Sequence, residues 1–358
     1  MSTSGEQRRA QIIGTGLIGG SVGLGLRAAG WHVSGTDRDP ETATAAVAAG
    51  ALDQVGSDPA AHLVVIALPV GAVAAAARGA LQSHPHAVIT DVGSVKAAIV
   101  EAVGGGRFVG GHPMAGSEQE GIAGSSATMF RGATWVLTPV VNTDPEAYAT
   151  VHSMVGSLGA EVVTLDPGEH DSVVAVISHV PHLTAATLMR LAAGRADRHG
   201  ALLRLAAGGF RDMTRIASGH PGIWPDICAE NRDAIVSALD ELIDELGAVR
   251  STVASSDRAR MLGQLDAARQ ARLNLPTTAP RAEALVELRV PVSDEPGRLA
   301  AVTTLATQLA VNIYDIELAH SAEGPRGVMI LVIAAEAAAG FVERLDELGY
   351  RSSTRSLG

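Results

Sequence analysis

Gln11-Ile12-Ile13-Gly14-Thr15-Gly16-Leu17-Ile18-Gly19 is the stretch that decides how the first part of this chain folds. Its first three residues, Gln11-Ile12-Ile13, predict a short buried strand, and a helix is expected over residues 20–29. A second strand, expected over residues 31–36, ends at Asp37. In such a unit the first glycine permits a tight turn, the second lets a pyrophosphate approach the backbone, and the third packs helix against strand. The stretch therefore predicts a dinucleotide-binding domain.

Two charged residues at the end of the second strand bear on which dinucleotide binds. The Asp37 carboxylate can accept hydrogen bonds from ribose hydroxyls and would repel a 2′-phosphate, which favours NAD. Arg38 could attract that phosphate instead, so the strength of the preference stays open. We expect NAD as the cofactor, and the residues expected to bind it are Gly14, Gly16, Leu17, Ile18, Gly19, Asp37, Arg38 and Pro69.

Strand-helix alternation continues to about residue 165 and predicts a Rossmann-type parallel sheet. The apolar run at residues 63–68 is typical of a parallel strand buried on both faces. Ligands of such sheets bind beyond the carboxyl ends of the strands, where Ser94 and His112 are expected. We place His112 on a loop that leaves a strand at residues 107–110.

His112 is the strongest catalytic candidate in this region. Histidine alone has an ordinary pKa that lets it accept or give a proton near neutral pH. A loop histidine by itself could be structural, and Ser94 could be the N-cap of a helix at residues 95–103, alone or in addition to a catalytic role. Lys96 and Asp91 could equally be a surface pair. Because several polar side chains gather at one sheet edge, we predict that His112 and Ser94 are catalytic.

From about residue 171 the predicted elements are all helical, over residues 173–191, 231–246 and 258–273. Their apolar faces are expected to pair across a homodimer. Two stretches are rich in polar residues, Ser178-His179-Val180-Pro181-His182 and Gly208 to Arg215, although either could be a surface cluster.

The C-terminal part predicts a β-α-β-β-α-β module of the ferredoxin-like kind. It contains no cluster of titratable residues that suggests catalysis, so a sensing or assembly role is expected. The predicted domains are a dinucleotide-binding domain at 8–166, a helical substrate and dimerisation domain at 167–276, a linker at 277–283 and the ferredoxin-like domain at 284–358.

Composition excludes several classes of function. The 358 residues are 47% hydrophobic and 3% aromatic, with a formal charge of −11, so nucleic acid and anionic membranes are poor partners. The single cysteine, Cys228, excludes a disulfide framework and a cysteine zinc site, and no metal is expected. We also expect no signal peptide and no run of membrane-spanning length, hence a cytoplasmic protein.

The whole chain resembles prephenate dehydrogenases that carry a C-terminal ACT domain. The resemblance covers about residues 10–275, and the turn Asp294-Glu295-Pro296-Gly297 extends it into the last module. It rests on five further motifs: Gly14-Thr15-Gly16-Leu17-Ile18-Gly19-Gly20-Ser21, Asp91-Val92-Gly93-Ser94-Val95-Lys96, Gly111-His112-Pro113-Met114-Ala115-Gly116, Ser178-His179-Val180-Pro181-His182 and Gly209-Phe210-Arg211-Asp212-Met213-Thr214-Arg215-Ile216-Ala217.

The resemblance implies NAD-dependent oxidative decarboxylation of prephenate to 4-hydroxyphenylpyruvate, in tyrosine biosynthesis. His112 would take or polarise the proton of the C4 hydroxyl, and Ser94 would orient that hydroxyl. Arg215 would bind a carboxylate of the dianionic substrate. The other residues implied at the substrate are His182, Ser178, Ser117, Glu118 and Trp224. In the ACT domain, L-tyrosine is a possible effector, bound near Asp294, Gly297 and Asn312.

Two alternatives stay open: an arogenate dehydrogenase, whose substrate has an amino group in place of the keto oxygen, and a non-catalytic nucleotide and amino-acid sensor. A β-hydroxyacid dehydrogenase is less favoured, because that chemistry relies on a helical-domain lysine and residues 171–275 contain none.

Overall fold

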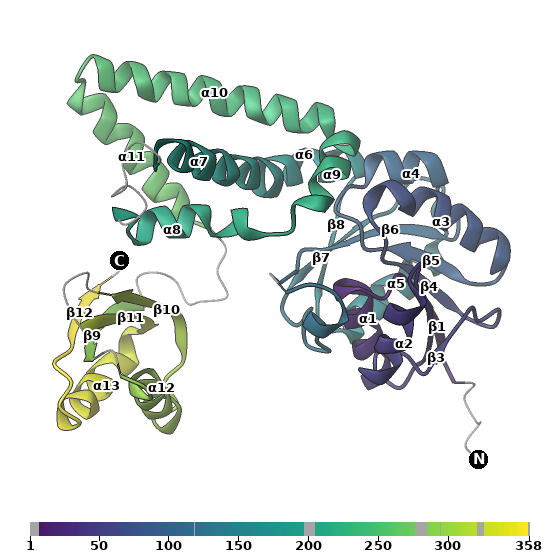
Figure 1. The fold of residues 1–358 in the computed structure, drawn as a ribbon, viewed down its shortest axis with the longest axis horizontal. Helices are drawn as coiled ribbons and strands as arrows, with labels where there is room; N and C mark the ends of the chain where they lie inside the picture. Colours follow the sequence, from purple (N-terminus) through teal and green to yellow (C-terminus); the bar gives the residue numbers. More distant parts are fainter. Residues whose placement is uncertain are drawn as a thin grey trace. The chain divides into compact units, whose positions relative to one another are not determined.

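The computed structural model describes residues 7–117, 119–196, 205–275, 285–293, 295–320 and 326–356 (Figure 1). Contacts divide the chain into two compact units, Met1–Glu245 and Leu246–Gly358. The predicted residues Glu118 and Asp294 lie outside the described ranges.

The first unit is built on an eight-stranded sheet in the order β3-β2-β1-β4-β5-β6-β7-β8. The first six strands of this order run parallel, whereas β7 runs antiparallel to β6 and parallel to β8. The Rossmann-type sheet is therefore present, with a mixed edge that the sequence did not predict. The strands are β1 (Arg9–Ile13), β2 (His32–Thr36), β3 (Gln54–Val55), β4 (Leu63–Ile66), β5 (Val88–Asp91), β6 (Phe108–Pro113), β7 (Thr134–Thr138) and β8 (Glu161–Thr164).

Helices cover both faces of this sheet, as β4 shows. Leu63 and Val65 pack into one apolar core with α1 and α5, while Val64 and Ile66 pack into a second core with α3 and α4. All four side chains are fully buried, which explains why the strand is apolar throughout. The helices of this part are α1 (Leu17–Ala28), α2 (Pro40–Ala48), α3 (Val70–Ser83), α4 (Ala97–Val103) and α5 (Pro145–Ser157).

His112 lies within a strand and not on a loop, so that prediction was wrong. β7 folds back antiparallel and pairs with residues 110–113, placing His112 opposite Val136. This pairing extends β6 through Pro113, beyond the apolar run that suggested a strand end. The consequence is that a strand backbone holds the His112 side chain.

A single helix was predicted over residues 173–191. The structure has a longer helical stretch there, which begins at Pro167, ends at Ala196 and changes its geometry in the middle. The stretch changes to π-helical geometry over Ala175–His179, just before Pro181, which has no N–H to give to the preceding turn. The described helices are α6 (Pro167–Val174), α7 (Val180–Ala196), α8 (Gly208–Thr214), α9 (Trp224–Glu230) and α10 (Arg232–Ala254), with 3₁₀ turns at Arg215–Ser218 and Pro221–Ile223.

The stretch Pro167–Arg195 corrects the expectation that no segment reaches membrane-spanning length. Its 29 residues are long and apolar enough to cross a membrane by length and composition alone, and 28% of its most apolar window is buried within the chain. Its first turns also carry the buried polar residues His170 and Asp171. Core helices of soluble proteins have the same length and composition, so this feature by itself assigns no membrane.

The second unit contains the end of α10, the helix α11 (Arg258–Leu273) and a four-stranded sheet in the order β10-β11-β9-β12. Its strands and helices alternate as β-α-β-β-α-β, and neighbouring strands are antiparallel, which confirms the ferredoxin-like prediction. Both helices pack on the same core as the strands, through Val302 and Phe341. The elements are β9 (Leu285–Ser293), α12 (Arg298–Gln308), β10 (Ile313–His320), β11 (Arg326–Ala334), α13 (Ala335–Glu347) and β12 (Ser353–Ser356).

Candidate active site

The glycines after β1 have the three environments that a dinucleotide loop needs. Gly14 has φ of +93°, and a Cβ there would lie 2.2 Å from the Ala67 carbonyl oxygen. A Cβ on Gly19 would lie 1.9 Å from the Gly14 oxygen, so helix and turn pack too closely for any side chain. A Cβ on Gly16 would meet no atom within 4 Å, so the backbone there faces open space. Gly16 is thus the position where a pyrophosphate can approach.

Asp37 is hydrogen-bonded to this loop. Its carboxylate accepts hydrogen bonds from the Thr15 backbone N–H at 2.7 Å and from the Asp39 N–H at 3.1 Å. These bonds hold the acid at the end of β2, with lone pairs remaining for ribose hydroxyls. Arg38 is exposed beside it.

Two neighbouring cavities lie beyond the carboxyl ends of the strands. The first, of about 420 Å³, collects most of the predicted cofactor and catalytic residues; among its lining residues are Gly16, Leu17, Ile18, Gly19, Pro69, Ser94, His112 and Ser117. The second, of about 450 Å³, is lined by residues that include His182, His220 and Trp224. Leu17, Ser117 and Ile223 line both cavities, so the two are adjacent.

Ser94 is half-buried at the first cavity. It does not cap the following helix: α4 begins after Lys96, and among the described residues no side chain caps that helix end. The N-cap alternative for Ser94 was therefore wrong, and its hydroxyl lies where a ligand could reach it.

His112 is 8% exposed and hydrogen-bonded through the ring. Its Nδ1 lies 2.9 Å from Nε2 of His170, and Nδ1 of His170 lies 2.7 Å from Oδ1 of Asp171. Burial holds the pKa of His112 well below its ordinary 6.5, and electrostatic interactions with His170, Lys96 and His179 lower it further. At neutral pH the His112 imidazole is uncharged and able to accept a proton.

Lys96 anchors the strand that carries His112. Its side chain is fully buried, and Nζ donates to the Asp91 carboxylate and, at 2.9 Å, to the carbonyl oxygen of Gly111. Asp91 also accepts from the Gly111 N–H at 3.1 Å. Burial lowers the pKa of Lys96, while Asp91 acts to raise it. Asp91 is fully buried as well, so the surface-pair alternative was wrong.

The second cavity contains an aromatic pair. The rings of His182 and Trp224 stack with centroids 3.8 Å apart and an interplanar angle of 16°. Burial lowers the pKa of His182, which favours its neutral form. The ring of His179 lies edge-on to Trp224, with centroids 6.0 Å apart, and burial lowers the pKa of His179 to about 4. His220 has Nδ1 accepting from the Gly222 N–H, which leaves Nε2 for a ligand.

The structure does not bring every predicted residue to these cavities. Ser178 is half-buried in the π-helical segment, and Arg215 is exposed in the turn after α8. Within the described part of the chain, neither lines the two cavities.

Sequence reasoning missed His170, Asp171 and His220. The His-Asp pair just after the Asp166-Pro167 helix start was the one available signal for the first two.

Comparison with known proteins decides the family. The family model described as "Prephenate dehydrogenase, nucleotide-binding domain" matches residues 22–164, and "Prephenate dehydrogenase, dimerization domain" matches residues 166–267. The chain belongs to the prephenate dehydrogenase family. The matches end before the ferredoxin-like part, so they leave the ACT prediction untested.

Individual members of the family are similar over most of their length. The prephenate dehydrogenase of Bacillus subtilis (strain 168) is 34% identical, over 89% of this chain and 90% of its own. A crystal structure of the Aquifex aeolicus prephenate dehydrogenase, in complex with hydroxyphenyl propionate and NAD+, matches with a TM-score of 0.71 and 28% identity, over 76% of this chain and 100% of its own. Synechocystis arogenate dehydrogenase matches with a TM-score of 0.64 and 30% identity, over 74% of this chain and 99% of its own.

Proposed function

We propose that this protein oxidises and decarboxylates prephenate to 4-hydroxyphenylpyruvate in tyrosine biosynthesis, in the cytoplasm, with NAD as cofactor. The observation that carries the proposal is a buried, neutral His112 on the wall of a cavity that also contains the open glycine Gly16. The family and the NAD+-bound Aquifex aeolicus relative support the same reaction. NAD, when bound, supplies the acceptor for a hydride.

The residues of the glycine loop fit the cofactor. Gly16 leaves room for the pyrophosphate, and Leu17, Ile18 and Gly19 begin α1, whose first amide groups can face it. Asp37 would accept hydrogen bonds from the adenosine ribose, with Arg38 beside it. Gly14 acts by shaping the turn, and Pro69 lines the same cavity as Gly16.

His112 and Ser94 would handle the proton of the reaction. As the hydride leaves C4 of prephenate, His112 takes the proton of the C4 hydroxyl, and Ser94 holds that hydroxyl in place. The bond from the ring to its carboxylate then breaks, carbon dioxide leaves, and the released electron pair makes the ring aromatic. The phenolate oxygen formed in this way takes back the proton from His112, so protons and electrons balance.

The rest of prephenate would occupy the second cavity. His182 stacked on Trp224 gives the ring an apolar wall with a polar edge, and Ser117 lies where the two cavities meet. Arg215 would reach one of the carboxylates, because a guanidinium pairs with a carboxylate through two hydrogen bonds. The resemblance implies that Ser178 serves the other end of prephenate together with His182, and that Glu118 and Trp224 gate the pocket or form its wall.

We predict that Arg215→Ala raises KM for prephenate about 10–150-fold. A charged hydrogen bond contributes roughly 1.5–3 kcal/mol, and each 1.4 kcal/mol is about tenfold in affinity. Steady-state kinetics measures KM, and calorimetry measures NAD binding, which is expected to stay unchanged. Arg232→Ala is the matched control, since that arginine forms an exposed ion pair with the neighbouring Asp233. Equal weakening of prephenate and NAD would show that Arg215 supports the fold.

One assay tests the function and its alternatives. The purified protein is incubated with NAD and either prephenate or arogenate, and nicotinamide absorbance is followed. Prephenate turnover is expected to exceed arogenate turnover. The reverse would identify an arogenate dehydrogenase, like the Synechocystis relative. NAD binding without turnover of either would support the sensor alternative.

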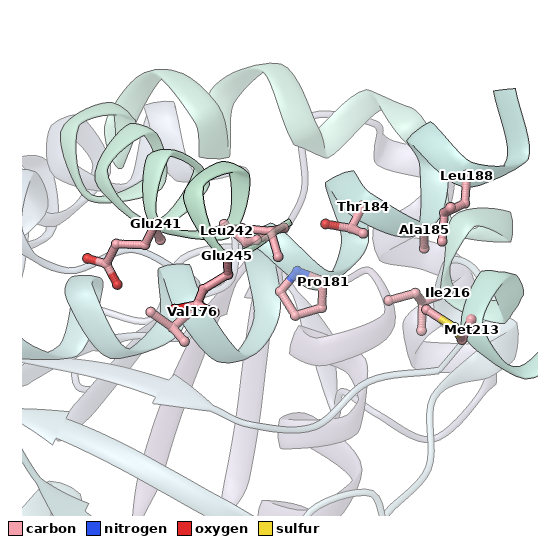
Figure 2. A pocket seen from close by; sticks show the side chains of 12 residues that line it. Val176, Pro181, Thr184, Ala185, Leu188, Met213, Ile216, Glu241, Leu242 and Glu245 are labelled. Atoms are coloured by element: carbon pink, nitrogen blue, oxygen red, sulfur yellow. The ribbon is translucent and has the colours of Figure 1, made fainter. Parts of the chain in front are cut away.

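We also propose that the helical region forms a homodimer, as the dimerization-domain description supports. An apolar groove of about 460 Å³ runs between α7, α8 and α10, and Figure 2 shows Pro181, Leu188, Met213 and Leu242 among the side chains that line it. Several large apolar side chains here are exposed in the isolated chain, including Met213 at 63% and Ile243 at 62%. A groove of this kind favours an apolar face of a second copy, because burying such surface stabilises a dimer.

Leu188→Asp is expected to shift the dimer towards monomer, because a charge in the groove must lose its water on association. Sedimentation at several concentrations would measure the shift between one and two chains of 36.5 kDa. Val141→Asp is the control, since that exposed side chain belongs to the loop after β7 and not to the groove. A Leu188→Asp protein that remains dimeric at low micromolar concentration would place the interface elsewhere.

For the C-terminal part we propose an ACT domain that binds L-tyrosine as an effector. Gly297 has φ of +89° and begins α12, whose first amide groups can face a carboxylate, and Asn312 is exposed just before β10. Asp294 belongs to the same turn in the sequence.

Tyrosine is expected to inhibit without competing with prephenate, with a coupling of only ~1–3 kcal/mol between the two sites. Asn312→Ala and Gly297→Asp should weaken this inhibition, and Asn142→Ala, an exposed asparagine of the first unit, should not. Inhibition kinetics at several prephenate concentrations would measure it. Purely competitive inhibition that survives both substitutions would move tyrosine to the active site.

A further inference from the structure

His112 is the first member of a buried chain of three side chains. His170 is fully buried, and Asp171 is 4% exposed. The hydrogen bonds run from Nδ1 of His112 to Nε2 of His170, at 2.9 Å, and from Nδ1 of His170 to Oδ1 of Asp171, at 2.7 Å. The two imidazoles meet edge to face, with an interplanar angle of 74°. Both His170 and Asp171 come from α6, whereas His112 comes from β6.

The direction of these hydrogen bonds follows from Asp171. Its carboxylate accepts from two backbone N–H groups at the start of α4, those of Lys96 and Ala97, each at 2.8 Å. Backbone N–H groups only donate, so Asp171 acts as an acceptor towards His170 as well. His170 therefore carries a proton on Nδ1, and in a singly protonated imidazole the other nitrogen, Nε2, is the acceptor. His112 must then donate from Nδ1, which leaves Nε2 as its unprotonated nitrogen.

We propose that His170, held by Asp171, is a positioning residue that fixes His112 in the tautomer with a bare Nε2 facing the substrate. Without this partner either ring nitrogen of His112 could carry the proton. Only the tautomer with a bare Nε2 leaves a base on the side of the ring away from His170. This proposal deepens the proposed function, on which it rests for the identity of the substrate hydroxyl.

The surroundings make this arrangement rigid. Asp166 caps the start of α6 by accepting from the Gly168 N–H at 2.8 Å, which sets the first turn that carries His170. Asn231 donates to the Asp171 carbonyl oxygen at 2.8 Å. Asp171 thus connects α4, α6 and the start of α10 through hydrogen bonds. The acceptor that orients His170 is therefore itself fixed by its neighbours.

The same chain supports the charge that forms during the reaction. When His112 takes a proton on Nε2, its ring becomes cationic in a buried site where charge is costly. The hydrogen bond to His170, and through it to the Asp171 carboxylate, places a negative group at the end of the chain. In Ser-His-Asp sites, loss of the carboxylate that controls the histidine tautomer lowers kcat by about 10⁴-fold.

Two variants of His170 separate positioning from packing. His170→Leu removes both hydrogen bonds, whereas His170→Gln keeps one acceptor for His112 and one donor for Asp171. His170→Leu is expected to lower kcat by ~10²–10⁴-fold with KM and NAD affinity within about threefold of wild type, and His170→Gln to recover at least tenfold of that loss. His84→Leu is the control, since His84 is equally buried but bonds to Gln11, away from both cavities.

Nitrogen-15 NMR with histidine-selective labelling reads the tautomer without any substrate. In wild type the His112 signals, identified by their loss in His112→Asn, should show a protonated Nδ1 and a bare Nε2, and in His170→Leu a mixture. Wild-type kcat in His170→Leu, equal losses in the leucine and glutamine variants, or an unchanged tautomer would each overturn the proposal. A wild type that turns over neither prephenate nor arogenate would overturn the proposed function instead, and the NMR result would still decide the tautomer.

Discussion

Replacing His112 with asparagine is expected to lower kcat by ~10²–10⁴-fold, the usual contribution of a general base. Asparagine keeps a hydrogen-bonding side chain of similar length, so the strand and the first cavity should persist, but it cannot take a proton. NAD affinity, measured by calorimetry, should stay unchanged because the glycine loop is untouched. His152→Asn, an exposed histidine on α5, serves as the control. Wild-type turnover in the His112 variant would remove His112 from the chemistry.

The pH dependence of wild-type activity should report the titration of His112. Burial, and electrostatic interaction with His170, Lys96 and His179, hold the pKa of His112 well below 6.5, and only the neutral ring can act as base. Activity should therefore be lost as pH falls through this lowered pKa. From pH ~6.5 upwards His112 is neutral, so its titration should no longer change the activity. In His112→Asn the residual activity should lack the acidic decline. A wild-type profile that declines at or above pH 6.5, with chemistry limiting the rate, would contradict the burial of His112.

Local signals were sufficient to predict the nucleotide-binding half of the site. Gly14, Gly16 and Gly19 are demanded by a backbone turn and by two close approaches, so their spacing in the sequence already specifies their roles. Similarly, Ser94 follows β5 and His112 lies near the end of β6, and parallel strands deliver such residues to one edge of the sheet. The ferredoxin-like module was predictable for a related reason, since its order of strands and helices is readable along the chain.

The remaining features depend on contacts that no local pattern contains. His170 meets His112 across 58 positions in sequence, and Lys96 meets Gly111 across 15. The extension of β6 through His112 results from antiparallel pairing with β7, in a part of the chain where only parallel strands were expected. Whether Lys96 and Asp91 face water or the core is likewise decided by tertiary packing.

Lys96 offers the largest expected effect on stability. It is the only lysine of the 358 residues, which together contain 27 lysines and arginines, and its ammonium group is fully buried between Asp91 and the Gly111 carbonyl oxygen. A buried ion pair adds little net stability compared with apolar residues, but removal of one partner leaves the other charge buried and uncompensated. Lys96→Met is therefore expected to lower the free energy of unfolding by roughly 3–5 kcal/mol.

Urea denaturation of the full chain, followed by the fluorescence of buried Trp31 and Trp135 in the first unit, would measure this loss. Arg232→Met, which breaks an exposed pair with Asp233, should cost less than ~1 kcal/mol. Asp91→Asn combined with Lys96→Met should be less destabilised than the sum of the two single variants, by ~0.5–3 kcal/mol, because it leaves no unpaired charge. Since Lys96 also holds Gly111 beside the catalytic histidine, the double variant should recover stability but not kcat. If Lys96→Met unfolds at the same urea concentration as wild type, Lys96 does not hold the end of β6 in the way its contacts indicate.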